Sequence, residues 1–365
     1  MNILIFIVIL LVLVLVHEWG HFFTAKKFGI RVDEFGFGFP PKIYGKKIGE
    51  TEYSLNLLPI GGFVKIFGEN PDDENTNGPD KDRSFVHKPR WQQAIVLFAG
   101  IFMNFVLAWV LFSISFMSGL PTSVRSDMRE FIQGDTHLVV ISVLENSSAE
   151  KAGLKSGDKI VHVESEGVVL EDINPETFRE FVGNKGGKNV AISYLEKDNI
   201  EKNIIVVPEI KEGIDKALIG ISMDELGVVK FPFGKAIVEG FKMNFIMIKA
   251  TMVGLYHFIV DGISGRGSLA SVSGPVGLVG VVGDAYKFGF VYLLSFAALI
   301  SINLGVINLV PFPALDGGRL LFLLIEKIKG SRISPKFANI ANAIGFFVLI
   351  GLMVLVTYHD IAKMF

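Results

Sequence analysis

The sequence HEWGH, residues 17 to 21, places two histidines and a glutamate in a pattern that can bind a metal ion. On a helix, His17 and His21 lie about 40° apart around the axis and about 6 Å apart along it, so both imidazoles can reach one ion. Glu18 then points toward the open position of the metal, where it can accept a proton from bound water. Exposed polar residues on a soluble helix can produce the same five letters, so the setting of the segment decides between the two interpretations.

That setting is an apolar run from Ile3 to Val16, which is suited to a lipid bilayer. Ionisable side chains at membrane depth are costly and usually serve a function. The run has no basic residue before Lys26 and no small-residue cleavage site after it, so we expect it to be retained rather than cleaved as a signal peptide. The pattern therefore predicts a metal site at the end of a membrane helix.

A catalytic zinc ion needs a third protein ligand and one open position. The chain has no cysteine, which excludes thiolate ligands. Asp316, in the segment NLVPFPALDGG, follows another apolar stretch and is expected on the same side of the membrane as the histidines. The prolines before it and the glycines after it predict irregular backbone, which is tolerated at membrane depth where it lines a cavity. Alternatively, Asp316 only caps the helix that follows it.

Two amides lie in the same apolar stretch as this segment. Asn303 and Asn308 need polar partners if they are buried. They can bond to each other or to the first helix as structural contacts between helices. Alternatively, Asn308, which is nearer to the metal end, can donate to a substrate backbone or to an oxyanion.

Composition points to a polytopic α-helical membrane protein. Half of the 365 residues are apolar and the mean hydropathy is +0.48. The net charge of −2 gives no reason to expect nucleic acid as a partner. A helix of about 20 apolar residues can cross a bilayer. We expect about four transmembrane helices, over residues 3–23, 91–119, 290–312 and 341–358.

A fifth segment, residues 236–263, is ambiguous. Glu239, Lys242 and Lys249 recur among apolar residues, which indicates an amphipathic helix on the membrane surface or against the bundle. The loops 24–90 and 317–336 carry 11 and five basic residues, so the positive-inside rule places both in the cytoplasm. Four spans satisfy this arrangement and five do not, which favours the surface position for 236–263.

The polar region between the second and third spans alternates short apolar runs with turn signals from residue 136 to residue 208. This pattern predicts a small sheet domain with one or two helices, inserted into the membrane protein. We expect this domain and both chain termini to lie outside the cytoplasm.

Several segments together resemble one known family. HEWGH and NLVPFPALDGG are similar to the two signature motifs of the site-2 protease family of intramembrane zinc metalloproteases. YSLNLLPIGGFVKIFGE (residues 53–69) resembles the membrane-reentrant β-hairpin of that family, and SVLENSSAEKAGLKSGDKIVHV resembles the start of its circularly permuted PDZ domain. SGPVGL and ISINLGVINL resemble the bacterial branch that includes the regulator of sigma-E protease. The chain has room for one PDZ domain, unlike the two-domain enterobacterial type.

The resemblance implies a site. His17, His21 and Asp316 would bind one Zn²⁺ per chain, and Glu18 would be the catalytic base. Asn303 and Asn308 would help to hold the substrate. The hairpin would pair with an extended substrate through five residues, Gly61, Gly62, Phe63, Val64 and Lys65.

We expect Gly61 and Gly62 to form the turn of that hairpin. The alternative is an ordinary cytoplasmic hairpin without a substrate role.

The resemblance also implies an activity and an organisation. The protein would be a zinc-dependent endopeptidase that cleaves single-span membrane proteins, such as anti-sigma factors or remnant signal peptides. It would be a multi-pass protein of the bacterial inner membrane, with the site toward the cytoplasm and an extracytoplasmic PDZ domain that binds a peptide or excludes large substrates. The alternative function is an inactive membrane PDZ scaffold with a vestigial zinc site. The predicted units are residues 1–120 with the hairpin at about 50–69, 121–235 with the PDZ domain at about 136–208, 236–289, and 290–365.

Overall fold

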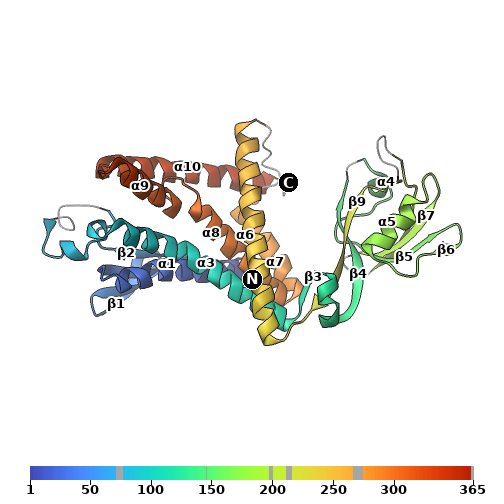
Figure 1. Ribbon diagram of the computed structural model, residues 1–365, viewed down its shortest axis with the longest axis horizontal. Helices are drawn as coiled ribbons and strands as arrows, with labels where there is room; N and C mark the ends of the chain where they lie inside the picture. Colours follow the sequence, from blue (N-terminus) through green and yellow to red (C-terminus); the bar gives the residue numbers. More distant parts are fainter. Residues whose placement is uncertain (71–76, 145, 197–199, 211–215, 266–273, 363–365) are drawn as a thin grey trace. The chain divides into compact units, whose positions relative to one another are not determined.

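The computed structural model describes the chain except for residues 71–76, 145, 197–199, 211–215, 266–273 and 363–365 (Figure 1). The chain divides into two compact units. The first, which we call the membrane unit, combines Met1–Ser115 with Gly234–Phe365, and the second is Phe116–Phe233.

The four predicted membrane segments all form helices in the membrane unit. Among the described residues, five helices are long and apolar enough to cross a membrane. They are α1 (Asn2–Lys27), α3 (Arg90–Ser118), α6 (Phe233–Ile263), α8 (Phe290–Leu309) and α10 (Pro335–Ala362). The prediction of a multi-pass helical membrane protein is therefore confirmed, whereas the number of spans stays a prediction.

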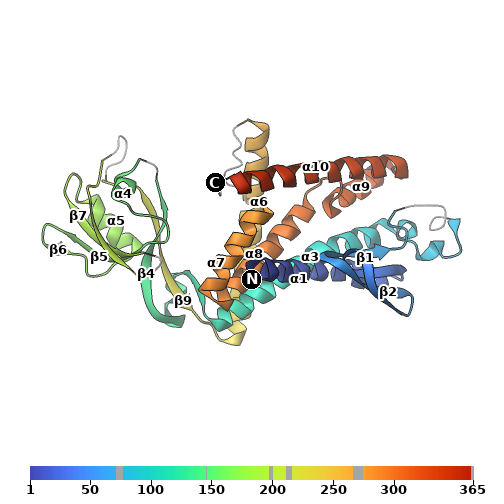
Figure 2. The same cartoon turned by 180° about the vertical axis from the view of Figure 1, so that it is seen from behind.

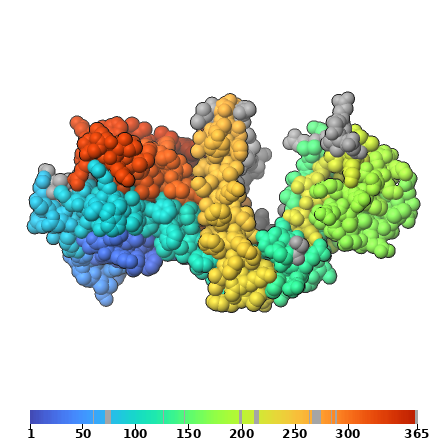
Figure 3. All heavy atoms as spheres, viewed as in Figure 1, coloured from blue at the N-terminus to red at the C-terminus, as the bar shows by residue number. Residues whose placement is uncertain are grey.

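The ambiguous segment forms one continuous helix, α6, whose length and composition permit a span. Figures 1 and 2 show α6 running across α1 and α3 rather than alongside them. Figure 3 shows it as an exposed ridge on one face, in keeping with exposed apolar residues such as Phe241, Phe245 and Tyr256. Two of its charged residues pair with each other: Lys242 Nζ donates to Glu239 Oε1 over 2.6 Å.

Shorter elements complete the membrane unit. The helix α7 (Pro275–Phe288) precedes α8, and α9 (Asp316–Lys329) links α8 to α10. Two 3-10 turns, η1 (Lys81–Arg83) and η2 (Phe85–His87), precede α3.

A long hairpin, β1 (Val32–Ile48) and β2 (Thr51–Ile66), follows α1. Its turn lies at Gly49 and Glu50, since Ile48 pairs with Thr51 and Gly49 has a φ of +65°, which favours glycine. The prediction that Gly61 and Gly62 form the turn is wrong, because both lie inside β2.

Both hairpin strands bend and pair more than once. Residues 34–37 pair with residues 62–65 on one side and with residues 52–55 on the other, and the second part of β1, residues 42–48, pairs with residues 51–56. Residues 62–66 therefore form one edge of the sheet and residues 42–48 form the other.

Charged residues tie the hairpin turn to the end of α1. Glu50 accepts hydrogen bonds from Lys26 Nζ at 2.6 Å and from the guanidinium of Arg83 at 2.5 Å. These two cations hold the pKa of the Glu50 carboxyl below its usual value, and the hydrogen bond from Lys26 is the larger cause.

The second unit is a twisted antiparallel sheet with short helices. Its strand order is β3-β9-β4-β5-β7-β8, and β6 pairs with β5. Leu138, Val163 and Ile192 of the strands pack with Phe178 of α5 in its core. The strands are β3 (Leu120–Ser123), β4 (Ile132–Val143), β5 (Lys159–Ser165), β6 (Val168–Val169), β7 (Val190–Leu195), β8 (Glu201–Val206) and β9 (Ile221–Val229). The helices are η3 (Ser126–Phe131), α4 (Ser148–Lys151) and α5 (Pro175–Gly183).

The sheet extends past the range 136–208 predicted for the PDZ domain. The strand β9 pairs with β4 from Ile132 to Val143 and therefore belongs to the same sheet. The polar residues Asp224 and Glu225 interrupt the alternation in β9, so periodicity alone gives no signal for this strand. The identification of the unit as a PDZ domain stays a prediction.

Candidate metal centre

His17 and His21 lie one turn apart within α1, and both are buried where α1 packs against α3. Their Nε2 atoms are 3.2 Å apart, so the two rings converge on one point. The close approach of the helices depends on Gly20, where a Cβ atom would lie 2.4 Å from the carbonyl oxygen of Ala99.

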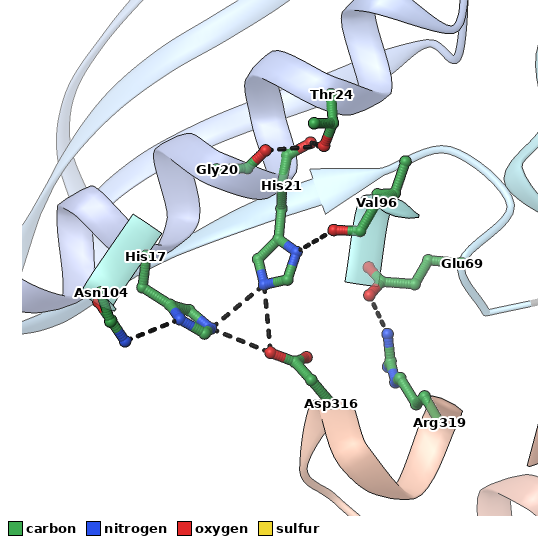
Figure 4. A network of polar contacts seen from close by, with 9 residues as sticks. All are labelled: His17, Gly20, His21, Thr24, Glu69, Val96, Asn104, Asp316 and Arg319. Carbon is green, nitrogen blue, oxygen red and sulfur yellow. Dashed lines mark hydrogen bonds and ion pairs between the residues drawn. The ribbon is translucent and has the colours of Figure 1, made fainter. Parts of the chain in front are cut away.

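Asp316 reaches the same point from the other end of the chain. Its Oδ2 atom lies 3.1 Å from Nε2 of His17 and 3.3 Å from Nε2 of His21 (Figure 4). Among the described residues, these three form a group of side chains that could hold a metal ion.

The three atoms have the spacing that a zinc ion requires. Ligand bonds of about 2.0–2.2 Å at tetrahedral angles place neighbouring ligand atoms about 3.3 Å apart. The observed separations are 3.1, 3.2 and 3.3 Å. Oδ2 of Asp316 is also buried without a hydrogen-bond partner in the described part of the chain. A buried carboxylate oxygen needs such a partner, so the donor set and its geometry both fit zinc.

Glycines allow the loop after α8 to turn sharply and present Asp316. A Cβ atom at Gly317 would lie 2.3 Å from the carbonyl oxygen of Val310, and one at Gly318 would lie 2.2 Å from that of Phe312. Asp316 is the first residue of α9, and no side chain makes a capping hydrogen bond at this helix start. The alternative that Asp316 serves as the helix cap is therefore wrong.

The helix α10 supports the loop from the other side. The backbone N–H of Ala314 donates to Oδ1 of Asn342 over 3.1 Å. A Cβ atom at Gly345 would lie 2.4 Å from the carbonyl oxygen of Pro313, so the loop and α10 are in direct contact. Ala314 has a φ of +75°, which is costly for a residue other than glycine, and these contacts help to hold it.

Glu18 faces the hairpin. Its carboxylate interacts with the backbone of Val64 in β2 and, through charge, with Arg319 of α9. Arg319 forms an ion pair with Glu69, three residues after the end of β2, so α9 is tied to the end of the hairpin (Figure 4). Among the predicted hairpin residues, Val64 is thus the one that interacts with the histidine motif in the described part of the chain.

The two predicted amides do not bond to each other. Asn303 is exposed and accepts a hydrogen bond from the hydroxyl of Thr251 in α6 over 3.3 Å. Asn308 is half-buried, and its side chain makes no hydrogen bond within the described part of the chain. The proposed pairing of Asn303 with Asn308 or with the first helix is therefore wrong, and the substrate role of both stays a prediction.

One face of α3 supports the histidines, and the sequence reasoning missed it. The carbonyl oxygen of Val96 lies 2.8 Å from Nδ1 of His21, and the side-chain amide of Asn104 lies 3.1 Å from Nδ1 of His17. Between them, a Cβ atom at Gly100 would lie 2.2 Å from Nε2 of His21. The only sequence signal is that these three residues are spaced four apart, as the histidines are.

The amide of Asn104 suits a metal-binding His17. A histidine that binds metal through Nε2 carries its hydrogen on Nδ1, which then needs an acceptor. The amide presents Nδ2 to the ring, and its buried Oδ1 has no partner among the described residues. The oxygen and nitrogen ends of an amide have nearly the same shape, so the Asn104 amide can be turned by 180° about its axis. In that orientation, Oδ1 of Asn104 accepts a hydrogen bond from the protonated Nδ1 of His17.

Comparison with known proteins gives an independent finding. The model of peptidase family M50 matches residues 5–352. The chain belongs to this family of site-2 proteases. A zinc metalloprotease RasP of Shouchella clausii is 32% identical over all of this chain and 99% of its own length. A Clostridium perfringens protein named as a candidate zinc metalloprotease is 37% identical, over 96% of this chain and 95% of its own.

Membership of family M50 confirms the predicted activity and cofactor. The protein is an intramembrane metalloprotease that depends on zinc. The resemblance first inferred from HEWGH and NLVPFPALDGG extends over nearly the whole of this chain.

Proposed function

We propose that His17, His21 and Asp316 bind one zinc ion and that Glu18 is the general base for cleavage of membrane segments of single-span proteins. The observation that carries this proposal is the convergence of three ligand atoms from α1 and α9 within 3.3 Å of one another. Glu18 follows His17 directly and lies three residues before His21, but it is not a member of this group.

The side chains divide the chemistry. When bound, zinc supplies Lewis acidity, which lowers the pKa of water to about 7 and polarises a carbonyl. Glu18 accepts a proton from the attacking water and returns it to the leaving amine. Val96 and Asn104 keep the histidine rings turned toward Asp316, because each accepts a hydrogen bond from Nδ1 once that atom is protonated.

The edge of the hairpin is the proposed substrate site. A transmembrane helix hides its carbonyl groups in internal hydrogen bonds, so a scissile segment must unwind before hydrolysis. Residues 62–66 form a sheet edge, and the backbone of Val64 on this edge meets Glu18. An extended segment that adds to this edge gains backbone partners and brings its carbonyl to the metal centre. Gly62, Phe63 and Lys65 lie on the same edge and Gly61 directly precedes it. Asn303 and Asn308 on α8 are proposed to contact the substrate as well.

The proposed topology keeps the metal centre at the cytoplasmic side of the bacterial inner membrane. The helices α3 and α8 are antiparallel, because Ser115 contacts Ser295 while the backbone of Asn104 contacts Ser301. The helix α6 begins near the end of α3, since Trp109 Nε1 donates to the carbonyl of Ile237. Because α8 starts at this same end, α6 and α7 together make no net crossing. This supports a surface position for α6 and four spans.

The second unit is proposed as an extracytoplasmic PDZ domain that binds a peptide. A cavity of about 260 Å³ lies between α5 and the start of β9. It is lined by Phe178 and Val182 of α5 and by residues 217–223. A groove between a helix and a strand is where an extended peptide can add to a sheet. Anti-sigma factors and remnant signal peptides are the proposed substrates of the whole protein.

The experiment is cleavage of a single-span test protein in proteoliposomes by the wild type and by Glu18→Gln, with zinc measured in both. We expect Glu18→Gln to keep its zinc and to lose cleavage by a factor of about 100 or more, since general-base catalysis contributes about 10²–10⁴. Cleavage by Glu18→Gln at the wild-type rate would remove Glu18 from its role. A zinc-loaded wild type that cleaves no member of a broad panel of single-span proteins would favour the inactive scaffold.

A further inference from the structure

Two cavities adjoin at the basic end of the membrane unit. The first, of about 420 Å³, lies among the start of α3, α9 and the start of α10. The second, of about 760 Å³, lies between α3 and α9. Arg90 and Leu323 line both cavities, so the two spaces are neighbours. Both volumes fall in the range of about 300–1,000 Å³ that is typical of small-molecule sites.

The two cavities differ in character. Charged side chains line much of the first, among them Lys88, Arg90, Arg319 and Arg332 with Glu69 and Glu326. The second is an apolar groove whose walls come from Trp91, Ala94, Ile95, Leu320 and Leu324. Its only charged lining residues are Arg90 and Lys327.

The basic residues outnumber their acidic partners. Arg319 is paired with Glu69, and Arg332 donates to the carbonyl of Val86 over 2.8 Å. Arg90 has Glu326 at 3.9 Å, the limit of an ion pair, and Lys327 has no ion pair within the described part of the chain. Arg90 and Lys327 therefore place two positive charges at the apolar groove, against one acidic partner, Glu326.

The groove also has the features of a membrane interface. Arg90 and Trp91 begin the apolar helix α3, and the side chain of Trp91 is 58% exposed. Tryptophan and arginine at the end of a span lie at the level of lipid headgroups. The helix α9 has exposed Leu324 and Ile328 next to Lys327, which is the pattern of a helix that lies in the interface.

We propose that this groove binds an anionic phospholipid, with its phosphate held by Arg90 and Lys327 and an acyl chain between α3 and α9. A basic pocket beside membrane helices suits an anionic headgroup. The apolar walls distinguish such a lipid from a soluble anion, which would leave them in contact with water. A lipid in the groove also contacts both α3 and α9, and therefore helps to hold α9, which begins at Asp316, against α3.

Trp91 provides a direct probe in the full-length protein. The quenching of tryptophan fluorescence is measured in nanodiscs that contain brominated phosphatidylglycerol or brominated phosphatidylcholine at equal mole fraction. The difference between the wild type and Trp91→Phe gives the quenching of Trp91 itself. We expect stronger quenching by phosphatidylglycerol. Removal of each of the two charges, in Arg90→Gln and Lys327→Gln, is expected to weaken this preference about fivefold.

Matched controls separate a lipid site from general attraction. Lys329→Gln removes a charge from the last turn of the same helix and is expected to keep the preference, because Lys329 does not line the groove. Ala94→Phe fills the groove without changing charge and is expected to reduce quenching by both lipids. Zinc content serves as the check that each variant is folded.

Three results would overturn the proposal. The first is equal quenching by the two lipids in the wild type. The second is a loss of preference in Lys329→Gln as large as in the double variant Arg90→Gln/Lys327→Gln. The third is loss of the preference in inorganic phosphate but not in chloride of the same ionic strength, which would indicate a site for a free anion.

Discussion

Nε2 of His17 lies 3.1 Å from Oδ2 of Asp316, although the two residues belong to helices near opposite ends of the chain. This relationship closes the donor set that α1 alone leaves incomplete. It depends on the turn after α8, where Gly317 and Gly318 pass against backbone carbonyl groups.

Asp316→Ala is expected to lose zinc, because it removes the third ligand and leaves two histidines. The loss of affinity should exceed the factor of about 10–100 that follows removal of an outer hydrogen-bond partner. Zinc is measured in the purified protein by mass spectrometry of the metal, before and after dialysis against a weak chelator. Glu326→Gln, in the same helix, is the matched control and should keep its zinc. An unchanged zinc content in Asp316→Ala would exclude Asp316 as a ligand.

Asn104→Leu is expected to weaken zinc binding about 10–100-fold, because Nδ1 of His17 loses its acceptor and the ring loses its orientation. Asn104→Asp keeps an acceptor at this position and should retain most of the affinity. Competition with a chelator of known affinity gives the zinc dissociation constant for each variant. Equal weakening by both substitutions would indicate a packing role for Asn104 instead.

Gly100→Ala is expected to abolish cleavage and to reduce zinc binding. Its Cβ atom would lie 2.2 Å from Nε2 of His21, so the ring must leave its position. Gly254→Ala, within α6, is a matched control because a Cβ atom there meets nothing within 4 Å. Zinc content and cleavage are measured for both variants. If Gly100→Ala keeps full zinc and full cleavage, α3 does not constrain the histidine ring.

Val64→Pro is expected to lower kcat/KM for a membrane substrate at least tenfold while zinc content stays unchanged. Proline removes a backbone N–H from the edge at which the substrate is proposed to pair. Lys47→Pro lies on the opposite edge of the hairpin sheet and serves as the control. Equal cleavage by the two variants would argue against substrate pairing at residues 62–66.

The position of α6 can be tested by labelling, because the chain contains no cysteine. Ser264→Cys, directly after α6, is expected to react in intact cells with a maleimide that does not cross membranes. Ser334→Cys, between α9 and α10, is expected to react only after the cells are opened. Protection of Ser264→Cys in intact cells would show that α6 crosses the membrane and would contradict the four-span topology.

The features that depend on local spacing follow from the amino-acid sequence alone. The histidines at positions 17 and 21 share a helix face because of the helical repeat, and the long apolar runs indicate α1, α3, α8 and α10. Asp316 was also predicted as the third ligand, from its place after an apolar span and between prolines and glycines. The structure brings its carboxylate to the histidines.

Which distant segments meet depends on how the folded chain packs. Gly61 and Gly62 suggested a turn, but a Cβ atom at Gly62 would lie 2.9 Å from the carbonyl oxygen of Gly36, so this glycine permits a close approach between strands. Gly100 and Asn104 have no local pattern of their own, and their roles arise because α3 packs against α1 at the histidines. The periodicity of a helix or strand indicates which of its faces is buried. It does not indicate which other segment will pack against that face, because the partner lies far away in the sequence.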